Sequence, residues 1–227
     1  MKKLTVGLFT DAFYPVFDGV VRVVDNYARN LTKYMNVIVF APLYCETFND
    51  KTLPYKVVRC KSFKVPFIDY SLPMPKMDNS FHRELKKYHL DIVHIHSPFT
   101  IGETGIKYAK RNHIPVVGTM HSQYKQDFYR AVKMKWLSNL LTKKIVRVFD
   151  KCSQCYAVNS GMAKLYYEDY GVRELPKVLN NATEMKLVNN TKSSRERINV
   201  LHKLNDKDKV FLFVGRINKL KNILNIF

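Results

Sequence analysis

Acidic residues are scarce in this sequence. Against 38 Lys and Arg stand only 19 Asp and Glu, so the 227-residue chain has a formal net charge of +19. Such an excess rules out a surface of balanced charge and indicates a polyanionic partner: nucleic acid, anionic lipid headgroups or phosphorylated ligands. The sequence has no helix-turn-helix, zinc-finger or RNP-type signature, so we expect no nucleic acid among its partners.

Long apolar runs are also missing. No segment approaches the ~20 residues that a helix needs to cross a bilayer. Met1-Lys2-Lys3 and the apolar residues Leu4–Phe9 could open a signal peptide, but the apolar run is short and no small-residue cleavage site follows. We therefore expect a cytoplasmic protein that is at most peripheral, at the inner face of the cell membrane.

Metal-binding patterns are incomplete. The chain has four cysteines, and the spacing of Cys152 and Cys155 suits zinc or redox chemistry, but Cys45 and Cys60 do not form the second pair that a four-ligand zinc site needs. His94 and His96 share one face of a predicted strand without a carboxylate at ligand spacing. Reduced thiols, hydrogen-bonded histidines and no metal are the favoured interpretation.

What the sequence does contain is an alternation of strands and helices. It is 46% hydrophobic, enough for one sizeable core. Short apolar runs, typical of strands buried on both faces, alternate with segments of helical period, which predicts an α/β fold with a doubly wound parallel sheet. The predicted strands are Leu4–Phe9, Val37–Ala41, Lys56–Cys60, Asp91–Ile95, Pro115–Thr119, Gln154–Val158 and Lys177–Leu179. The predicted helices are Val20–Lys33, Asn79–Tyr88, Ile101–Arg111, Gln123–Phe149 and Gly161–Tyr170.

A second unit begins near the C-terminus. After the polar stretch Asn189–Arg197 we expect a helix over Glu196–Leu204 and a buried strand over Val210–Val214. One strand and one helix cannot bury a core of their own. The sequence therefore predicts one complete domain, residues 1–175, and an interdomain segment with the incomplete start of a second domain, residues 176–227.

Candidate ligand-binding residues follow the predicted strands, because open parallel sheets bind ligands beyond the carboxyl ends of their strands. The first such loop runs from Thr10 to Gly19, where a glycine lets backbone approach a ligand. It is not G-x-G-x-x-G, which disfavours a nicotinamide enzyme. His96 and His121 end two further strands. His121 can bond a sugar hydroxyl or a phosphate, and the alternative is a capping or buried, satisfied histidine.

The predicted helix Gln123–Phe149 combines basic and apolar residues on one side. Its core-facing stripe comprises Met134, Leu137, Leu141, Ile145, Val148 and Phe149. The other side carries Lys133, Trp136, Leu140, Lys143, Lys144, Arg147 and Lys151. Cations that meet anionic headgroups, with an aromatic and an aliphatic side chain that enter the interface, are typical of a membrane-surface helix. The alternative is that Trp136 and Leu140 pack on a neighbouring element.

Six segments follow one another along the chain in a recognisable order: Phe13–Val21, Asp91–Pro98, Pro115–His121, Ala157–Ser160, Lys177–Glu184 and Val214–Lys221. Together they resemble glycosyltransferase family 4, whose members are retaining enzymes with two Rossmann-like domains, the GT-B fold. The diacylglycerol glucosyltransferases are the most similar group within it, and the resemblance covers essentially the whole chain.

The resemblance implies transfer of a hexose, such as glucose, from a nucleotide sugar, such as UDP-glucose, to a membrane lipid such as diacylglycerol. It implies that Gly19 faces the cleft between the domains and that His121 lies near the reacting sugar. Arg216 and Lys221 match the basic pair that holds the donor diphosphate, where leaving-group charge develops, so that neither a catalytic metal nor another cofactor is needed. Glu184 matches an acidic position whose role stays open.

Two residues depart from the family pattern. Asp18 stands where many members have a first glycine, and Ala182 stands where the pattern usually reads Asn-Gly. We group Asp18, Gly19, His96 and Glu184 as donor- or acceptor-binding candidates. The second domain of the family, with its nucleotide pocket, lies outside these 227 residues, so we expect the chain alone to be inactive.

Two other functions remain compatible with the sequence. One keeps the sugar transfer but makes the acceptor soluble or polyprenyl-linked. The other, of a different class, is a non-catalytic membrane-binding module. Liposome binding separates the soluble-acceptor enzyme from the other two, and donor binding separates the enzymes from the module.

Overall fold

A single parallel sheet forms the centre of the first part of the chain. The structure is a computed structural model that describes residues 3–46, 48–64, 71–182, 190–205, 207–214 and 225. In it seven strands pair, every neighbour in parallel, in the order β3-β2-β1-β6-β7-β8-β9. Their bounds are β1 Thr5–Phe9, β2 Asn36–Pro42, β3 Lys56–Cys60, β6 Ile92–Ile95, β7 Val116–Met120, β8 Gln154–Ala157 and β9 Lys177–Val178.

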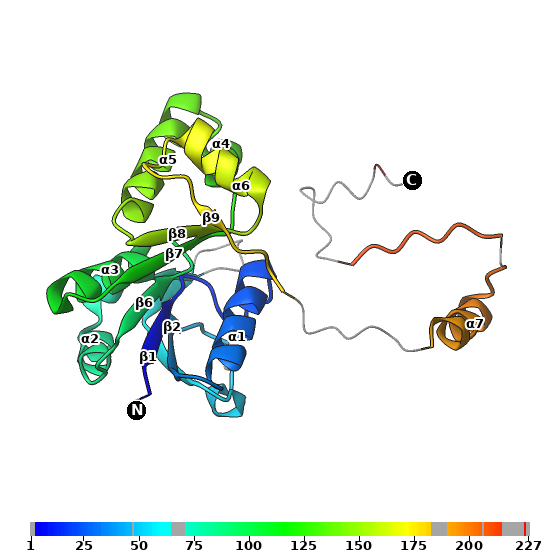
Figure 1. The fold of residues 1–227 in the computed structure, drawn as a ribbon, viewed down its shortest axis with the longest axis horizontal. Coiled ribbons are helices and arrows are strands. Elements are labelled where there is room, and N and C mark those ends of the chain that lie inside the picture. The colour runs from blue at the N-terminus through cyan, green and yellow to red at the C-terminus, as the bar shows by residue number, and fades with distance from the viewer. Residues whose placement is uncertain are drawn as a thin grey trace. The chain divides into compact units, whose positions relative to one another are not determined.

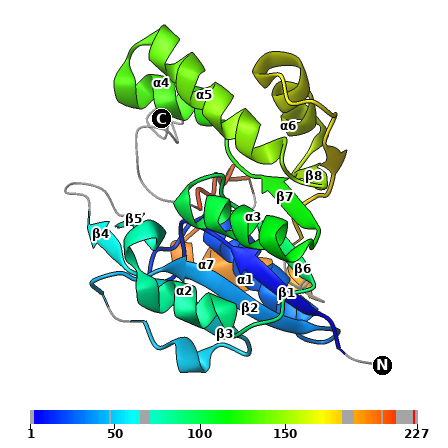
Figure 2. The ribbon, with the colours of Figure 1, turned by 90° about the vertical axis from the view of Figure 1, so that its left-hand side faces the viewer.

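Helices cover both faces of this sheet. Helix α1 (Gly19–Leu31) lies on one face, while α2 (Asn79–Lys86) and α3 (Thr100–Asn112) lie on the other (Figures 1 and 2). Side chains alternate along each strand, so Leu8 of β1 packs in the cluster that includes Val24 of α1, and Phe9 packs in the cluster that includes Phe81 of α2. The predicted α/β fold with a doubly wound parallel sheet is confirmed.

Short elements complete this part of the chain. An antiparallel pair, β4 (Ser62–Lys64) and β5 (Ser71–Pro73), and two single turns, η1 (Asp50–Thr52) and η2 (Pro75–Met77), escaped sequence prediction because three residues are too few to show a period. Helix α6 (Ser160–Lys164) continues as a π-helical turn, η3 (Leu165–Tyr170), and ends at Gly171, whose φ of 78° suits glycine.

The predicted single helix Gln123–Phe149 is wrong. It is a hairpin of two helices, α4 (Tyr124–Val132) and α5 (Lys135–Phe149). Lys133 takes a left-handed conformation, with φ 54° and ψ 15°, that ends α4. The two helices pack together, and the Ser138 hydroxyl donates to the Lys125 carbonyl oxygen at 2.7 Å. This tertiary contact outweighs the helical pattern of a sequence with no glycine or proline at the corner.

The chain divides into two compact units, Met1–Glu184 and Met185–Phe227. The boundary that the sequence predicts after residue 175 stays a prediction, although Lys177–Val178 pair with β8 as strand β9. The described part of the second unit contains α7 (Thr191–His202), which begins five residues before the predicted helix. The strand predicted at Val210–Val214 was wrong, because these exposed residues have no regular structure and no strand pairs with them in the part described.

Candidate functional site

The carboxyl ends of β1, β6 and β7 meet at one edge of the sheet. The chain winds from β1 outward to β2 and β3, and then restarts with β6 on the other side of β1, so the strand order reverses between β1 and β6. Ligands of open parallel sheets bind at such a reversal. His96 follows β6 and donates its backbone N–H to the Phe9 carbonyl at 2.8 Å, and His121 follows β7.

Three histidines form a buried cluster at this edge, on the face of the sheet that α1 covers. The His94 and His96 rings stack with centroids 4.0 Å apart, and Tyr27 of α1 contacts both. Nδ1 of His96 lies 3.0 Å from Nε2 of His121, and Nε2 of His94 lies 2.7 Å from the Thr119 hydroxyl. We call His94, His96 and His121 the histidine cluster. The sequence predicted one edge for His96 and His121 but not their contact, and Tyr27 and Thr119 carried no sequence signal.

The histidine cluster is neutral at pH 7. Burial lowers the pKa of His94 to about 3 and that of His121 to about 4, and it holds the pKa of His96 well below its usual range, with help from its two histidine neighbours. The Asp18 charge opposes this shift at His121. Within the described ranges, no three His, Cys, Asp or Glu side chains gather so as to hold a metal ion, and Cys152 and Cys155 are free thiols.

Asp11, in the loop that follows β1, caps the N-terminus of α3 with its side chain. Its carboxylate accepts the backbone N–H groups of Ile101 at 2.9 Å and Gly102 at 3.3 Å, and the Thr100 hydroxyl at 3.0 Å. Burial raises its pKa to about 6 in spite of these hydrogen bonds. Asp11 was not among the residues predicted from the sequence, although its position shortly after a buried strand was a signal for it.

Asp18 is the N-cap residue of its own helix, α1. Its Oδ1 accepts the Val21 N–H at 2.8 Å, as expected of an aspartate N-cap. A methyl group added at the neighbouring Gly19 would meet no atom within 4 Å, so the space next to this backbone is open. Gly19 thus lies at the start of a helix with room for another molecule beside it.

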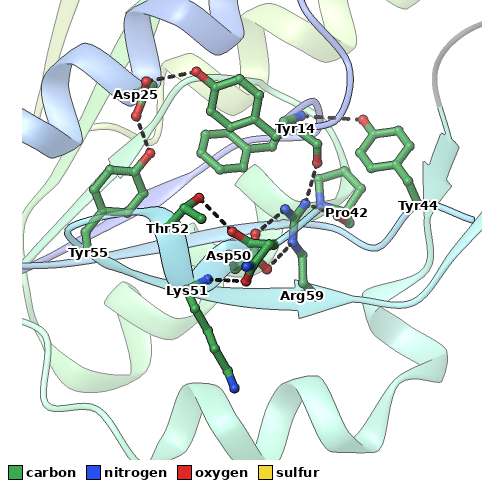
Figure 3. A network of polar contacts seen from close by, with 11 residues as sticks. Tyr14, Asp25, Pro42, Tyr44, Asp50, Lys51, Thr52, Tyr55 and Arg59 are labelled. Carbon is green, nitrogen blue, oxygen red and sulfur yellow. Dashed lines mark hydrogen bonds and ion pairs between the residues drawn. The ribbon is translucent and has the colours of Figure 1, made fainter. Parts of the chain in front are cut away.

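A polar network holds the loop between β1 and α1 in place (Figure 3). The Asp25 carboxylate accepts the Tyr14 hydroxyl at 2.8 Å, the Tyr55 hydroxyl, and Nε of Arg29 at 2.9 Å. Burial, with the Asp25 carboxylate, raises the pKa of Tyr14 to about 12. The loop that carries Asp18 and Gly19 is therefore tied to α1 and to the segment before β3.

Arg59 of β3 ties the same loop to the sheet. Its Nη1 donates to the carbonyl oxygens of Tyr14 and Pro42, both at 2.8 Å, and its other guanidinium nitrogens bind the Asp50 carboxylate at 2.9 and 2.6 Å (Figure 3). The guanidinium also lies 5.5 Å from the centre of the Phe13 ring. These contacts preorganise the loop before any ligand binds.

The α4–α5 hairpin starts directly behind His121. The Tyr166 hydroxyl donates to the Ser122 carbonyl at 2.9 Å, and the Tyr170 hydroxyl accepts the Lys125 N–H at 3.2 Å, so η3 fixes the segment between the histidine and the hairpin. The Phe99 and Tyr124 rings meet edge to face, 5.3 Å apart, at the N-terminal end of α4. The hairpin is therefore an extension of the sheet edge.

The buried side of α5 differs from the predicted stripe. Ser138 and Thr142 are buried, while Met134 is exposed and Leu137 and Leu141 are only half-buried; the break at Lys133 rotates the helix relative to a continuous one. Ile145, Val148 and Phe149 face the core as predicted.

The solvent-facing side of the hairpin carries both basic and apolar side chains. Trp136 is 66% exposed and Leu140 55%, so neither packs on a neighbouring element. None of the basic residues Lys133, Lys143, Lys144 and Arg147 forms an ion pair with any other part of the chain that the structure describes. In that part, no helix has both the length and the apolar character that crossing a bilayer requires.

Residues of both α4 and α5 line an open cavity of about 490 Å³ on the hairpin. Lys125, Arg130 and Lys135 line it together with Tyr129, Ser138 and Asn139. Asp127 pairs with Arg130 at 3.3 Å at its rim. The predicted site residues Glu184, Arg216 and Lys221 lie outside the described residues.

The parallel sheet, with helices on both faces, makes the first part of the chain a doubly wound α/β domain, and sequence comparison identifies the family. Residues 17–186 match Glycosyltransferase Family 4, and the chain belongs to this family. It is 26% identical over 97% of its length to the alpha-monoglucosyldiacylglycerol synthase of Streptococcus pneumoniae, and spans 50% of that protein.

Two further relatives are similar in sequence to parts of this chain. The alpha-monoglucosyldiacylglycerol synthase of Acholeplasma laidlawii is 31% identical over 62% of this chain and 34% of its own length. The GDP-mannose-dependent alpha-mannosyltransferase of Corynebacterium glutamicum is 25% identical over 77% of this chain and 42% of its own length. The chain thus spans half or less of the length of these relatives.

Proposed function

We propose that this chain forms the acceptor side of a retaining glycosyltransferase that moves glucose from a nucleotide sugar, UDP-glucose, to diacylglycerol at an anionic membrane surface. The observation that carries the proposal is the continuity between His121 and the exposed, basic and apolar α4–α5 hairpin, three residues further along. A hairpin that inserts into the headgroup region brings a lipid hydroxyl to the edge of the sheet. Two relatives that are named as glucosyldiacylglycerol synthases support this acceptor.

The candidate site residues have different proposed roles. His121 hydrogen bonds to an oxygen of the sugar, and the open space beside Gly19 admits the ligand. Asp18 and His96 support His121. Arg216 and Lys221 hold the donor diphosphate and stabilise the charge that develops as it leaves, in place of a metal ion. Glu184 belongs to the same site in a role that the family resemblance leaves open.

The membrane contact of this proposal has two components. Each Lys or Arg near an anionic surface contributes about 1 kcal/mol, so Lys133, Lys143, Lys144 and Arg147 give a salt-dependent attraction. Trp136 and Leu140 add apolar contact that salt does not screen. The protein is then peripheral at the cytoplasmic face of the membrane, and the bound lipid is both surface and acceptor.

Sedimentation with vesicles tests the membrane contact. Replacing Lys143, Lys144 and Arg147 by Glu should abolish binding of the chain to vesicles that contain phosphatidylglycerol. A matched control replaces Lys107, Lys110 and Arg111, the exposed cations of α3, by Glu with the same change in net charge, and it should keep most of the binding. Equal binding of the unmodified chain to neutral and anionic vesicles would refute the electrostatic component.

Turnover tests the chemistry in a protein that continues this chain to the length of its relatives. Arg216→Ala and Lys221→Ala should each lower the rate with UDP-glucose by roughly 10²-fold, because charge-assisted contacts to a leaving group contribute a few kcal/mol. GDP-mannose is the comparison donor, since one relative is named for it. Unchanged turnover in both variants would remove them from the site. The 227-residue chain alone should transfer no measurable sugar.

A further inference from the structure

Nε2 of His121 already has a hydrogen-bond partner inside the protein. It lies 3.0 Å from Nδ1 of His96, a side chain with no exposed surface. The two rings lie nearly parallel, 22° apart with centroids 5.3 Å from each other, as neighbours on adjacent strands. The ring nitrogen of His121 that remains for a ligand is therefore Nδ1, and its hydrogen decides whether it donates or accepts.

A hydrogen bond between two neutral imidazoles needs one donor, which leaves two arrangements. If His121 donates from Nε2, then His96 accepts at Nδ1 and carries its own hydrogen on Nε2. That nitrogen is buried and has no hydrogen-bond partner among the described residues. An orphaned N–H would thus be enclosed in the core, and such groups are rare in folded proteins.

The second arrangement avoids the orphaned N–H. His96 donates from Nδ1, and only a bare ring nitrogen is enclosed at its Nε2. His121 then accepts at Nε2 and carries its hydrogen on Nδ1.

We propose that His96 is a positioning residue, which donates to Nε2 of His121 and so holds the hydrogen of His121 on Nδ1, ready to bond an oxygen of the ligand. The ligand group is then a hydrogen-bond acceptor, a sugar hydroxyl or phosphate oxygen, and His121 does not serve it as a base. This inference rests on the proposed place of His121 in the transferase site. It follows the general rule that the hydrogen bond at one ring nitrogen of a histidine sets the state of the other.

The test reads the tautomers directly. In the 227-residue chain with nitrogen-15 in its histidine rings, two-dimensional proton–nitrogen NMR at neutral pH reports which ring nitrogen of each histidine carries hydrogen. The His121→Gln variant assigns the His121 signals by their loss. We expect a single His121 tautomer with its hydrogen on Nδ1. A hydrogen on Nε2 of His121 in the unmodified chain would overturn the proposal without any variant of His96.

Two variants of His96 separate positioning from mere packing. His96→Leu removes the donor, so the His121 signals should change to a mixture of both tautomers. His96→Asn places an amide N–H near the former Nδ1 and should restore the single tautomer. The exposed His89→Asn is the matched control and should change no His121 signal.

The outcomes distinguish this inference from the proposed function. An unchanged His121 tautomer in folded His96→Leu would refute the positioning role, and if that variant does not fold, the unmodified chain decides by itself. No donor, acceptor or turnover enters the measurement. A failed transfer assay with the expected tautomer would refute the proposed function alone, and the reverse result would refute the role of His96 alone.

Discussion

Around the loop that follows β1, charged groups have partners inside the protein. Asp25 binds two tyrosine hydroxyls and an arginine, and Arg59 binds a carboxylate and two carbonyls. On the α4–α5 hairpin, Lys143, Lys144 and Arg147 face solvent without an ion pair to the described part of the chain. The comparison indicates that the polar groups around this loop stabilise the fold, whereas Lys143, Lys144 and Arg147 of the hairpin are available to a partner.

Removal of Asp25 should have the largest effect on stability. Asp25→Ala leaves the Tyr14 and Tyr55 hydroxyls without their acceptor in a buried site, so we expect the free energy of unfolding to fall by about 4 kcal/mol. Urea denaturation measures it. The control Asp127→Ala breaks an exposed pair with Arg130 and should change stability by less than about 1 kcal/mol. Similar losses of stability in both variants would contradict the view that the buried Asp25 contacts stabilise the fold more than exposed ion pairs do.

A methyl group at Gly102 should be nearly as harmful. Its Cβ would lie 1.9 Å from the Ser97 carbonyl oxygen, so the backbone between β6 and α3 has to move. We expect Gly102→Ala to lower the free energy of unfolding by about 3 kcal/mol. Gly19→Ala, with no atom within 4 Å, should leave it within about 0.5 kcal/mol. A stable Gly102→Ala chain in thermal unfolding would contradict the close packing at this edge.

Asp11 should make stability depend on pH in an unusual direction. Its pKa is raised from 3.8 to about 6 in the folded chain, so the folded state binds the proton more tightly than the unfolded state. The stabilisation is complete below pH 3.8 and is lost as pH rises through about 6. The stability difference between the unmodified chain and Asp11→Asn should therefore shrink over this window, by at most about 3 kcal/mol.

Denaturation of both proteins at pH 4, 5, 6 and 7 gives that difference and cancels the titration of other carboxyl groups. A difference that stays constant, or that grows with pH, would show that the hydrogen bonds to Asp11 outweigh its burial.

The smallest effect on stability is expected on the hairpin. Trp136→Ala removes a 66% exposed side chain, so the free energy of unfolding should change by less than about 0.5 kcal/mol. Binding to anionic vesicles should nevertheless weaken, with an unchanged salt dependence, because the apolar component is lost and the cations remain. Tyr34→Ala is the control, because Tyr34 is another large aromatic side chain and is 76% exposed. A marked loss of stability in Trp136→Ala would place the side chain in the fold rather than at a partner surface.

The sequence predicted the central sheet well because its strands are apolar on both faces. The predicted limits of Lys56–Cys60 agree with β3, and those of Leu4–Phe9 differ from β1 by one residue. Parallel strands bring their carboxyl ends to one edge, so the common location of His96 and His121 was also predictable. Their ring contact was not, since it depends on strand register and side-chain rotamers.

Errors arose where tertiary contacts decide local structure. Nothing in the sequence around Lys133 predicts a left-handed residue, and the hairpin forms because α4 packs on α5. Val210–Val214 has the composition of a buried strand, but a strand needs a neighbour to pair with. The role of Asp11 depends on α3, some 90 residues further along, which no local pattern can reveal.

At Lys133, the residue best for the stability of the fold differs from the residue best for attraction to an anionic surface. A left-handed conformation costs a residue with a Cβ about 1 kcal/mol or more, and glycine adopts it freely. Lys133→Gly would therefore make the corner of the hairpin easier to form. The same change would remove a cation that attracts an anionic surface by about 1 kcal/mol. If the hairpin binds an anionic membrane as proposed, Lys133→Gly would therefore raise the stability of the fold and weaken that binding by similar amounts.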